Sequence, residues 1–182
     1  MSTATGTDRH ESGWLTGMFN DKDSSEGAYR SLRDRGYSDD DINVLMSDET
    51  RNRYWSDADK HDDGIGSKAA EGATTGGVIG GTLGAIAAGI AAIGTNVVLP
   101  GLGLIVWGPI AAGLAGAGAG GATGGLIGAL IGAGIPEERA REYENGIKNG
   151  GTVIGVRPRN DEDAEYLEND WRTNYNGQHV YR

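Results

Sequence analysis

The segment from Gly72 to Pro136 reads GATTGGVIGGTLGAIAAGIAAIGTNVVLPGLGLIVWGPIAAGLAGAGAGGATGGLIGALIGAGIP, and the rest of the chain is arranged around it. It contains no Asp, Glu, Lys, Arg or His. It is also long enough for two helices that each cross a hydrocarbon layer of about 30 Å. The sequence therefore predicts a helical hairpin over residues 72–135, with two arms that Asn96–Pro109 separates.

Small residues recur at every fourth position along both arms of this expected hairpin. An i, i+4 spacing places them in a row on one side of a helix, where a second helix can approach closely. We expect the row to make helix–helix contacts within the hairpin and between copies of the chain. The positions are Gly72, Gly76, Gly80 and Gly84 in the first arm, and Gly108, Gly116, Gly120, Gly124, Gly128 and Gly132 in the second.

The predicted hairpin could be surrounded either by lipid or by other copies of the protein in water. Glycine lowers helix stability in water by roughly 1 kcal/mol per residue, whereas in lipid the backbone must bond to itself and the helix is enforced. This favours insertion into a bilayer. In the alternative, the hairpins pack inside a water-soluble oligomer. A flexible linker is disfavoured, because Val, Ile and Leu recur between the glycines at helical spacing.

The residues between the two arms form a second predicted feature, an apolar tip. Asn96, Pro100 and Gly101 are turn formers, yet the residues around them are more hydrophobic than the arms. A tip of this kind should be buried in lipid, in a partner or at the centre of an oligomer. Its large apolar residues are Val98, Leu99, Leu102, Leu104, Ile105 and Trp107.

The flanking sequences predict one α+β domain that the hairpin interrupts. Residues 14–47 read as strand 14–19, helix 24–35 and strand 42–46, and Asp23 three residues before Glu26 indicates a capping box. Residues 136–182 read as helix, strand 152–156, helix and strand 179–181. Neither half has enough strands for a stable sheet, so we expect both to join one sheet covered by helices. Residues 1–13 are expected to be disordered, and residues 48–71 to form an acidic tether.

Composition excludes several functional classes. The net charge is −10, and an acidic surface argues against a nucleic-acid partner. The chain has no cysteine, which removes disulfides, thiolate catalysis and zinc–sulfur sites. The N-terminus has no apolar stretch of the kind found in secretory signals. Lys68, Arg139 and Arg141 flank the hairpin, which favours a cytoplasmic position for both soluble halves.

No pattern in the chain indicates catalysis or cofactor binding. The three histidines are far apart, and no GxSxG motif occurs. Asp57, Asp59 and His61 have the spacing of a calcium loop, but Asp62 stands where that loop needs glycine and Lys68 where it needs glutamate. We therefore predict no catalytic, cofactor-binding or metal-binding residue, no cofactor and no enzymatic activity.

Residues 18–51, MFNDKDSSEGAYRSLRDRGYSDDDINVLMSDETR, and residues 143–156, YENGIKNGGTVIGV, resemble the domain of bacterial heat-induced general stress proteins. The likeness lies in the Gly36-Tyr37 turn after the helix, the acidic entry at Asp40-Asp41 and the paired glycines before the later strand. The resemblance implies a stress-induced or membrane-associated protein whose family carries a similar glycine-rich insertion. It implies no catalytic residues.

These observations lead to a functional hypothesis with two alternatives. We expect a non-enzymatic, stress-associated protein that self-assembles through the predicted hairpin of residues 72–135. Its small residues at every fourth position form the packing surface known as a glycine zipper. Its partners would be further copies of itself and the lipid bilayer of the cytoplasmic membrane. The first alternative is a water-soluble homo-oligomeric particle in the cytoplasm. The second is a membrane-anchored module that senses a ligand, which would require a cluster of polar residues near Gly150-Gly151.

Overall fold

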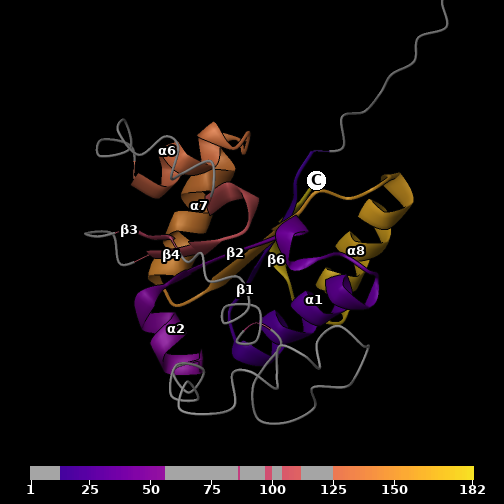
Figure 1. Ribbon diagram of the computed structural model, residues 1–182, viewed down its shortest axis with the longest axis horizontal. Helices are drawn as coiled ribbons and strands as arrows, with labels where there is room; N and C mark the ends of the chain where they lie inside the picture. Colours follow the sequence, from indigo (N-terminus) through magenta and orange to yellow (C-terminus); the bar gives the residue numbers. More distant parts are fainter. Residues whose placement is uncertain (1–12, 56–85, 87–96, 100–103, 112–124) are drawn as a thin grey trace, which may run out of the picture.

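The computed structural model describes residues 13–55, 86, 97–99, 104–111 and 125–182 (Figure 1). A six-stranded sheet in the order β3-β4-β2-β5-β1-β6 forms its centre, and every neighbouring pair is antiparallel. The strands are β1 (Leu15–Phe19), β2 (Ile42–Ser47), β3 (Val97–Leu99), β4 (Leu104–Trp107), β5 (Thr152–Val156) and β6 (Gln178–Tyr181).

The two flanking halves of the chain interleave in this sheet. Strand β5 from the second half lies between β1 and β2, and β1 from the first half lies between β5 and β6. Each half is thus a split β-α-β unit, and the order β2-β5-β1-β6 is that of a ferredoxin-like sheet. The predicted α+β class and the four strands predicted in the flanks are confirmed.

Helices cover both faces of the sheet (Figure 1). α1 (Lys22–Asp34) and α8 (Asp161–Thr173) pack on one face, against Leu15, Phe19 and Ile154. α6 (Gly125–Gly132) and α7 (Glu137–Lys148) pack on the other, against Met18 and Val153. Successive strand residues point to opposite faces, so covering both faces buries all five residues of β1 and of β5.

Local signals at the ends of α1 explain where this helix starts and stops. Asp21, rather than Asp23, is the N-cap residue, and its carboxylate accepts a hydrogen bond from the Ser24 amide at 2.8 Å. The helix therefore begins two residues before its predicted start. At its other end, Gly36 has φ +83°, and the Tyr37 amide donates to the Leu32 carbonyl, as in a Schellman motif.

The acidic tether predicted for residues 48–71 is wrong for its first part, because α2 (Asp48–Trp55) occupies it. Ser47 Oγ accepts a hydrogen bond from the Thr50 amide at 3.0 Å and so satisfies a free donor at the helix start. The two buried side chains of α2 are Thr50 and Trp55. Tertiary burial of Trp55 thus stabilises a helix whose sequence has no apolar period.

The predicted apolar tip is not the tip of a helical hairpin. Its residues form β3 and β4, and β4 extends the sheet by pairing with β2, with Val44 opposite Trp107 and Ser47 opposite Leu104. Two short apolar runs separated by a Pro-Gly pair in the sequence are typical of a β-hairpin, and β2 supplies a partner strand for β4. Val98, Leu99, Leu104, Ile105 and Trp107 belong to these strands, whereas Leu102 lies outside the described residues.

The described helices include none with the length and apolar character that a bilayer crossing requires. Most of the predicted helical arms, residues 72–85, 87–95 and 112–124, lie outside the described part of the chain. The structure therefore describes the α+β domain and the points at which the glycine-rich segment, residues 72–135, attaches to it.

Candidate functional site

The ten small-residue positions predicted to pack helices fall into two groups. Seven of them, Gly72, Gly76, Gly80, Gly84, Gly116, Gly120 and Gly124, lie outside the described residues. Three are described: Gly108, Gly128 and Gly132. Gly108 lies in the turn after β4, whereas Gly128 and Gly132 both lie in α6.

Gly108 is not a helix-packing residue. It forms the turn after β4 with φ +97°, a conformation that favours glycine strongly. A Cβ atom here would lie 2.2 Å from the Ile42 carbonyl oxygen and 2.9 Å from Asn43 Cα. The packing role predicted from its place in the row is therefore wrong. Its conformation and its contact with the β2 backbone require glycine instead.

Gly128 and Gly132 lie on the open face of α6. A Cβ atom at either position would meet no atom within 4 Å, and neighbouring Ile131 is 43% exposed. The opposite face of the helix carries Leu126 and Leu130, which are buried with residues of α7. Since α6 has no polar side chain at all, its open face presents only small and apolar groups to the surroundings.

A buried carboxylate joins the glycine-rich segment to the domain on the other face of the sheet. Glu26 in α1 is only 5% exposed. Its Oε1 accepts a hydrogen bond from the indole Nε1 of Trp55 at 2.7 Å, and its Oε2 accepts one from the Ile86 amide at 3.2 Å. The expected capping box of Asp23 and Glu26 is thus absent, and Trp55 is buried.

A buried amide makes a second junction. Asn43 in β2 accepts a hydrogen bond from the Ile110 amide at 2.7 Å and donates one to the Gly155 carbonyl at 3.4 Å. The Ile110 amide belongs to a helical turn over residues 109–111 that starts at Pro109, where proline is favourable. Asn43 therefore links the chain after β4 to two central strands.

Sequence reasoning did not find Glu26 or Asn43, because both act through partners far along the chain. Glu26 is 60 positions from Ile86, and Asn43 is 67 from Ile110. The one local signal is their position: Glu26 borders the apolar face of α1, and Asn43 interrupts an apolar strand. A polar residue in such a place needs a buried partner, although the sequence does not say which.

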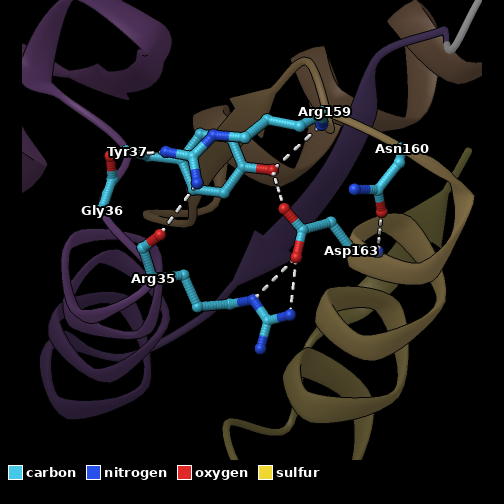
Figure 2. A network of polar contacts seen from close by, with 6 residues as sticks. All are labelled: Arg35, Gly36, Tyr37, Arg159, Asn160 and Asp163. Carbon is cyan, nitrogen blue, oxygen red and sulfur yellow. Dashed lines mark hydrogen bonds and ion pairs between the residues drawn. The ribbon is translucent and has the colours of Figure 1, made fainter.

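A polar network surrounds Asp163 and includes Arg35, Tyr37 and Arg159 (Figure 2). Asp163 Oδ1 accepts hydrogen bonds from Arg35 Nε at 3.1 Å and Nη2 at 2.5 Å, and Oδ2 accepts one from the Tyr37 hydroxyl at 2.9 Å. The Arg35 hydrogen bonds, supported by Tyr37, hold the pKa of Asp163 below its ordinary value. Burial raises the pKa of Tyr37.

The remaining contacts of this network serve the fold. Arg159 Nη1 donates to the Arg35 carbonyl at 3.0 Å, and its guanidinium lies over the Tyr37 ring at 4.2 Å from the centroid (Figure 2). Asn160 Oδ1 accepts a hydrogen bond from the Asp163 amide at 2.7 Å and caps α8. The network thus fastens the end of α1 to the start of α8, and we assign it no chemistry.

Asp163 provides a test of this structural role. The Asp163→Asn variant is expected to lose about 1–2 kcal/mol of stability at pH 7, because it loses a charge-assisted contact. Since the folded-state pKa of Asp163 is lowered, the wild-type advantage exists above the ordinary Asp pKa of about 4 and disappears as the pH falls through the lowered value. Urea unfolding between pH 7 and pH 2 measures the difference.

A neighbouring carboxylate serves as the control for this experiment. Asp161→Asn lies in the same helical turn at an exposed position, and it should change stability by much less. If Asp163→Asn and Asp161→Asn unfold alike at pH 7, the Arg35–Asp163 contact does not stabilise the fold.

A further polar cluster contains the one histidine among the described residues. His179 Nδ1 lies 3.1 Å from Glu142 Oε2, which also accepts a hydrogen bond from the Tyr181 hydroxyl at 2.8 Å. Within the described ranges, no group of three or more His, Cys, Asp or Glu could hold a metal ion.

Gly150 and Gly151 end α7, where the Gly151 amide donates to the Gly146 carbonyl at 2.9 Å.

Comparison of the chain with protein-family models, with curated proteins and with solved structures finds no match.

Proposed function

We propose that this protein is a non-enzymatic, stress-associated protein that self-associates through its glycine-rich segment, residues 72–135. The link to stress comes from the resemblance of residues 18–51 and 143–156 to heat-induced general stress proteins. The self-association comes from the small and apolar groups of the segment itself. In this proposal the acidic α+β domain surrounds the assembly, and its net negative charge keeps the particle soluble.

The observation that carries the proposal is the open face of α6. Gly128 and Gly132 lie four residues apart on it, with Ile131 beside them. An exposed apolar helix face of this kind favours burial against another helix, and glycines at this spacing let the backbones approach closely. The same spacing continues toward the N-terminus through Gly124, Gly120 and Gly116.

The attachment points of the segment support an assembly in water. The Ile86 amide is bonded to Glu26, and β4 is paired with β2, so both ends of residues 87–96 are held at the domain. Crossing a hydrocarbon layer and returning takes about 40 helical residues, more than this stretch contains. Residues 112–124, between Ala111 and α6, are equally too few.

The lipid bilayer is the second proposed partner. It would take up a form of the protein in which the Ile86–Glu26 hydrogen bond and the pairing of β4 with β2 are broken. The absence of charge from residues 72–136 favours it. Such a form belongs to the cytoplasmic membrane, and the assembly in water belongs to the cytoplasm. Expression without detergent, followed by sizing of the soluble fraction and of the membrane fraction, separates the two. A uniform soluble particle supports assembly in water, and recovery only with membranes supports insertion.

A double substitution on α6 tests self-association directly. Gly128→Leu with Gly132→Leu should leave the domain folded, because both positions face open space. It should prevent close approach of a second helix, so the particle measured by light scattering is expected to shrink toward the monomer mass of 18.9 kDa. An unchanged particle size would refute the proposed interface, and the same pair of substitutions at Gly120 and Gly124 extends the test.

The control separates blocked packing from added apolar surface. Glu165→Leu with Asn169→Leu places two leucines at the same spacing on an exposed part of α8. This variant should keep the particle size of the wild type. If both double variants change the size alike, the effect comes from leucine on the surface rather than from the α6 face.

A further inference from the structure

Three asparagines of the chain are each followed by glycine, in the pairs Asn145-Gly146, Asn149-Gly150 and Asn176-Gly177. All three asparagine side chains are exposed. In such a pair the backbone nitrogen of the glycine can attack the side-chain amide of the asparagine, because glycine has no Cβ atom to obstruct the approach. The three pairs are chemically alike, so differences in their reactivity come from the fold.

The fold holds two of these glycines in place. Gly146 is buried within α7, where it packs against Met18. Gly177 donates its amide proton to the Trp171 carbonyl at 2.7 Å and is enclosed by the side chains of Val180 and Phe19. In both pairs the attack therefore requires the structure to open locally.

The pair Asn149-Gly150 lies where α7 ends. Asn149 is the C-cap residue of the helix, and Gly150 follows it with φ +94°. The Gly150 amide donates to the Ile147 carbonyl at 3.0 Å, a contact that closes only the last turn. Helix ends fray, so this amide should be released at lower cost than the amides of the other two glycines.

Two polar side chains of α2 lie beside Gly150. A Cβ atom on this glycine would be 3.7 Å from Arg53 Nη1 and 3.9 Å from Thr50 Oγ1. A guanidinium favours the anion that forms when an amide loses its proton, and it can donate to the oxygen that becomes negative during the attack. In the described structure, the three atoms nearest to such a Cβ on Gly146 or Gly177 include no charged group.

We propose that Asn149 is the site of a spontaneous modification, deamidation to aspartate and isoaspartate, with water as the other reactant. The Gly150 nitrogen gives up its proton and forms a bond to Asn149 Cγ. The bond from Cγ to the side-chain nitrogen breaks, and this nitrogen leaves as ammonia with the proton. Water then opens the cyclic imide at one of its two carbonyls, which gives aspartate or isoaspartate. Nothing is oxidised or reduced.

The modification should weaken the end of α7. A carboxylate at the C-cap meets the negative end of the helix dipole, which disfavours it. Isoaspartate also adds a carbon to the main chain and so displaces the Gly150 and Gly151 amides from the carbonyls that they bind. Because α6 and α7 share one buried cluster, the support of α6 should loosen as well. This chemistry does not depend on self-association.

Mass spectrometry of the full chain tests the selectivity. The protein is incubated at mildly alkaline pH and digested at intervals, and the asparagine, aspartate and isoaspartate forms of each peptide are separated. In the folded protein, Asn149 is expected to convert about tenfold faster than Asn145 and Asn176. In urea, where the fold is lost, the three should convert at similar rates. Equal rates in the folded protein, or fastest conversion at another asparagine, would overturn the proposal.

A pair of matched substitutions tests the part played by Arg53. Arg53→Gln removes the guanidinium beside Gly150 and should slow the conversion of Asn149 about threefold. Arg141→Gln is the control, since both arginines are exposed and form an i, i+4 ion pair with a glutamate, but Arg141 lies earlier in α7. It should leave the rate unchanged. If the two variants have the same rate, the role assigned to Arg53 is wrong.

Discussion

Replacing Gly108 with alanine is expected to destabilise the fold by about 3 kcal/mol or more. The residue has φ +97°, which costs any other amino acid energy, and its new methyl group would lie 2.2 Å from the Ile42 carbonyl oxygen. Two of the three nearest atoms, the Ile42 carbonyl oxygen and Asn43 Cα, belong to the β2 backbone, which cannot turn aside as a side chain can. Urea unfolding monitored by far-ultraviolet circular dichroism measures the loss.

The control for this prediction is a glycine from the same predicted row. Gly128→Ala lies inside α6, faces open space and should stabilise the helix by up to about 1 kcal/mol, because alanine favours helix more than glycine does. If Gly108 and Gly128 were equivalent packing residues of one row, replacing either with alanine would change the stability by a similar amount. Equal changes in stability would therefore contradict the turn that the structure gives Gly108.

The contrast between these two glycines shows where sequence reasoning succeeded and where it stopped. The i, i+4 spacing correctly placed Gly128 and Gly132 on one face of a helix. The same spacing, extended to Gly108, crossed into a strand and a turn. Spacing alone does not reveal where a helix gives way to a strand, because Val, Ile and Leu suit both structures when they are buried.

The flanks were easier to predict because local and long-range preferences agree there. Strands β1, β2 and β5 are short apolar runs between turn residues, and Gly36 follows the end of α1. Each signal acts within a few residues of the structure that it specifies. The order of the strands was not predicted, since it depends on pairings between the two halves of the chain.

The junctions of the candidate site depend on partners that local patterns do not identify. The sequence places Glu26 three residues after Asp23, which suggests a cap, but the structure gives the capping role to Asp21. Glu26 is then free to turn inward toward Trp55. The decisive information is the burial of Trp55, at the end of α2, beside Glu26, and α2 itself has no apolar period from which to predict it.

Replacing Trp171 with alanine is expected to cost about 3–5 kcal/mol, a large share of the stability of a domain of this size. Its indole is fully buried, meets Phe19 edge to face at 5.5 Å between centroids, and donates to Ser31 Oγ at 3.3 Å. The side chain thus joins α8 from the second half of the chain to β1 and α1 from the first. Chemical denaturation measures the loss, and hydrogen exchange locates it.

The interleaved sheet adds a sharper expectation about where protection is lost. Because β5 lies between β1 and β2, weakening α8 should increase exchange in β2 and β5 together, although the aromatic and hydrogen-bond partners of Trp171 lie in β1 and α1. Tyr166→Ala on the same helix is the control, since its ring is 48% exposed and its contact with Arg35 is worth about 1 kcal/mol or less. Loss of protection in the second half alone would mean that the halves fold independently, and the single interleaved domain would then be the wrong description.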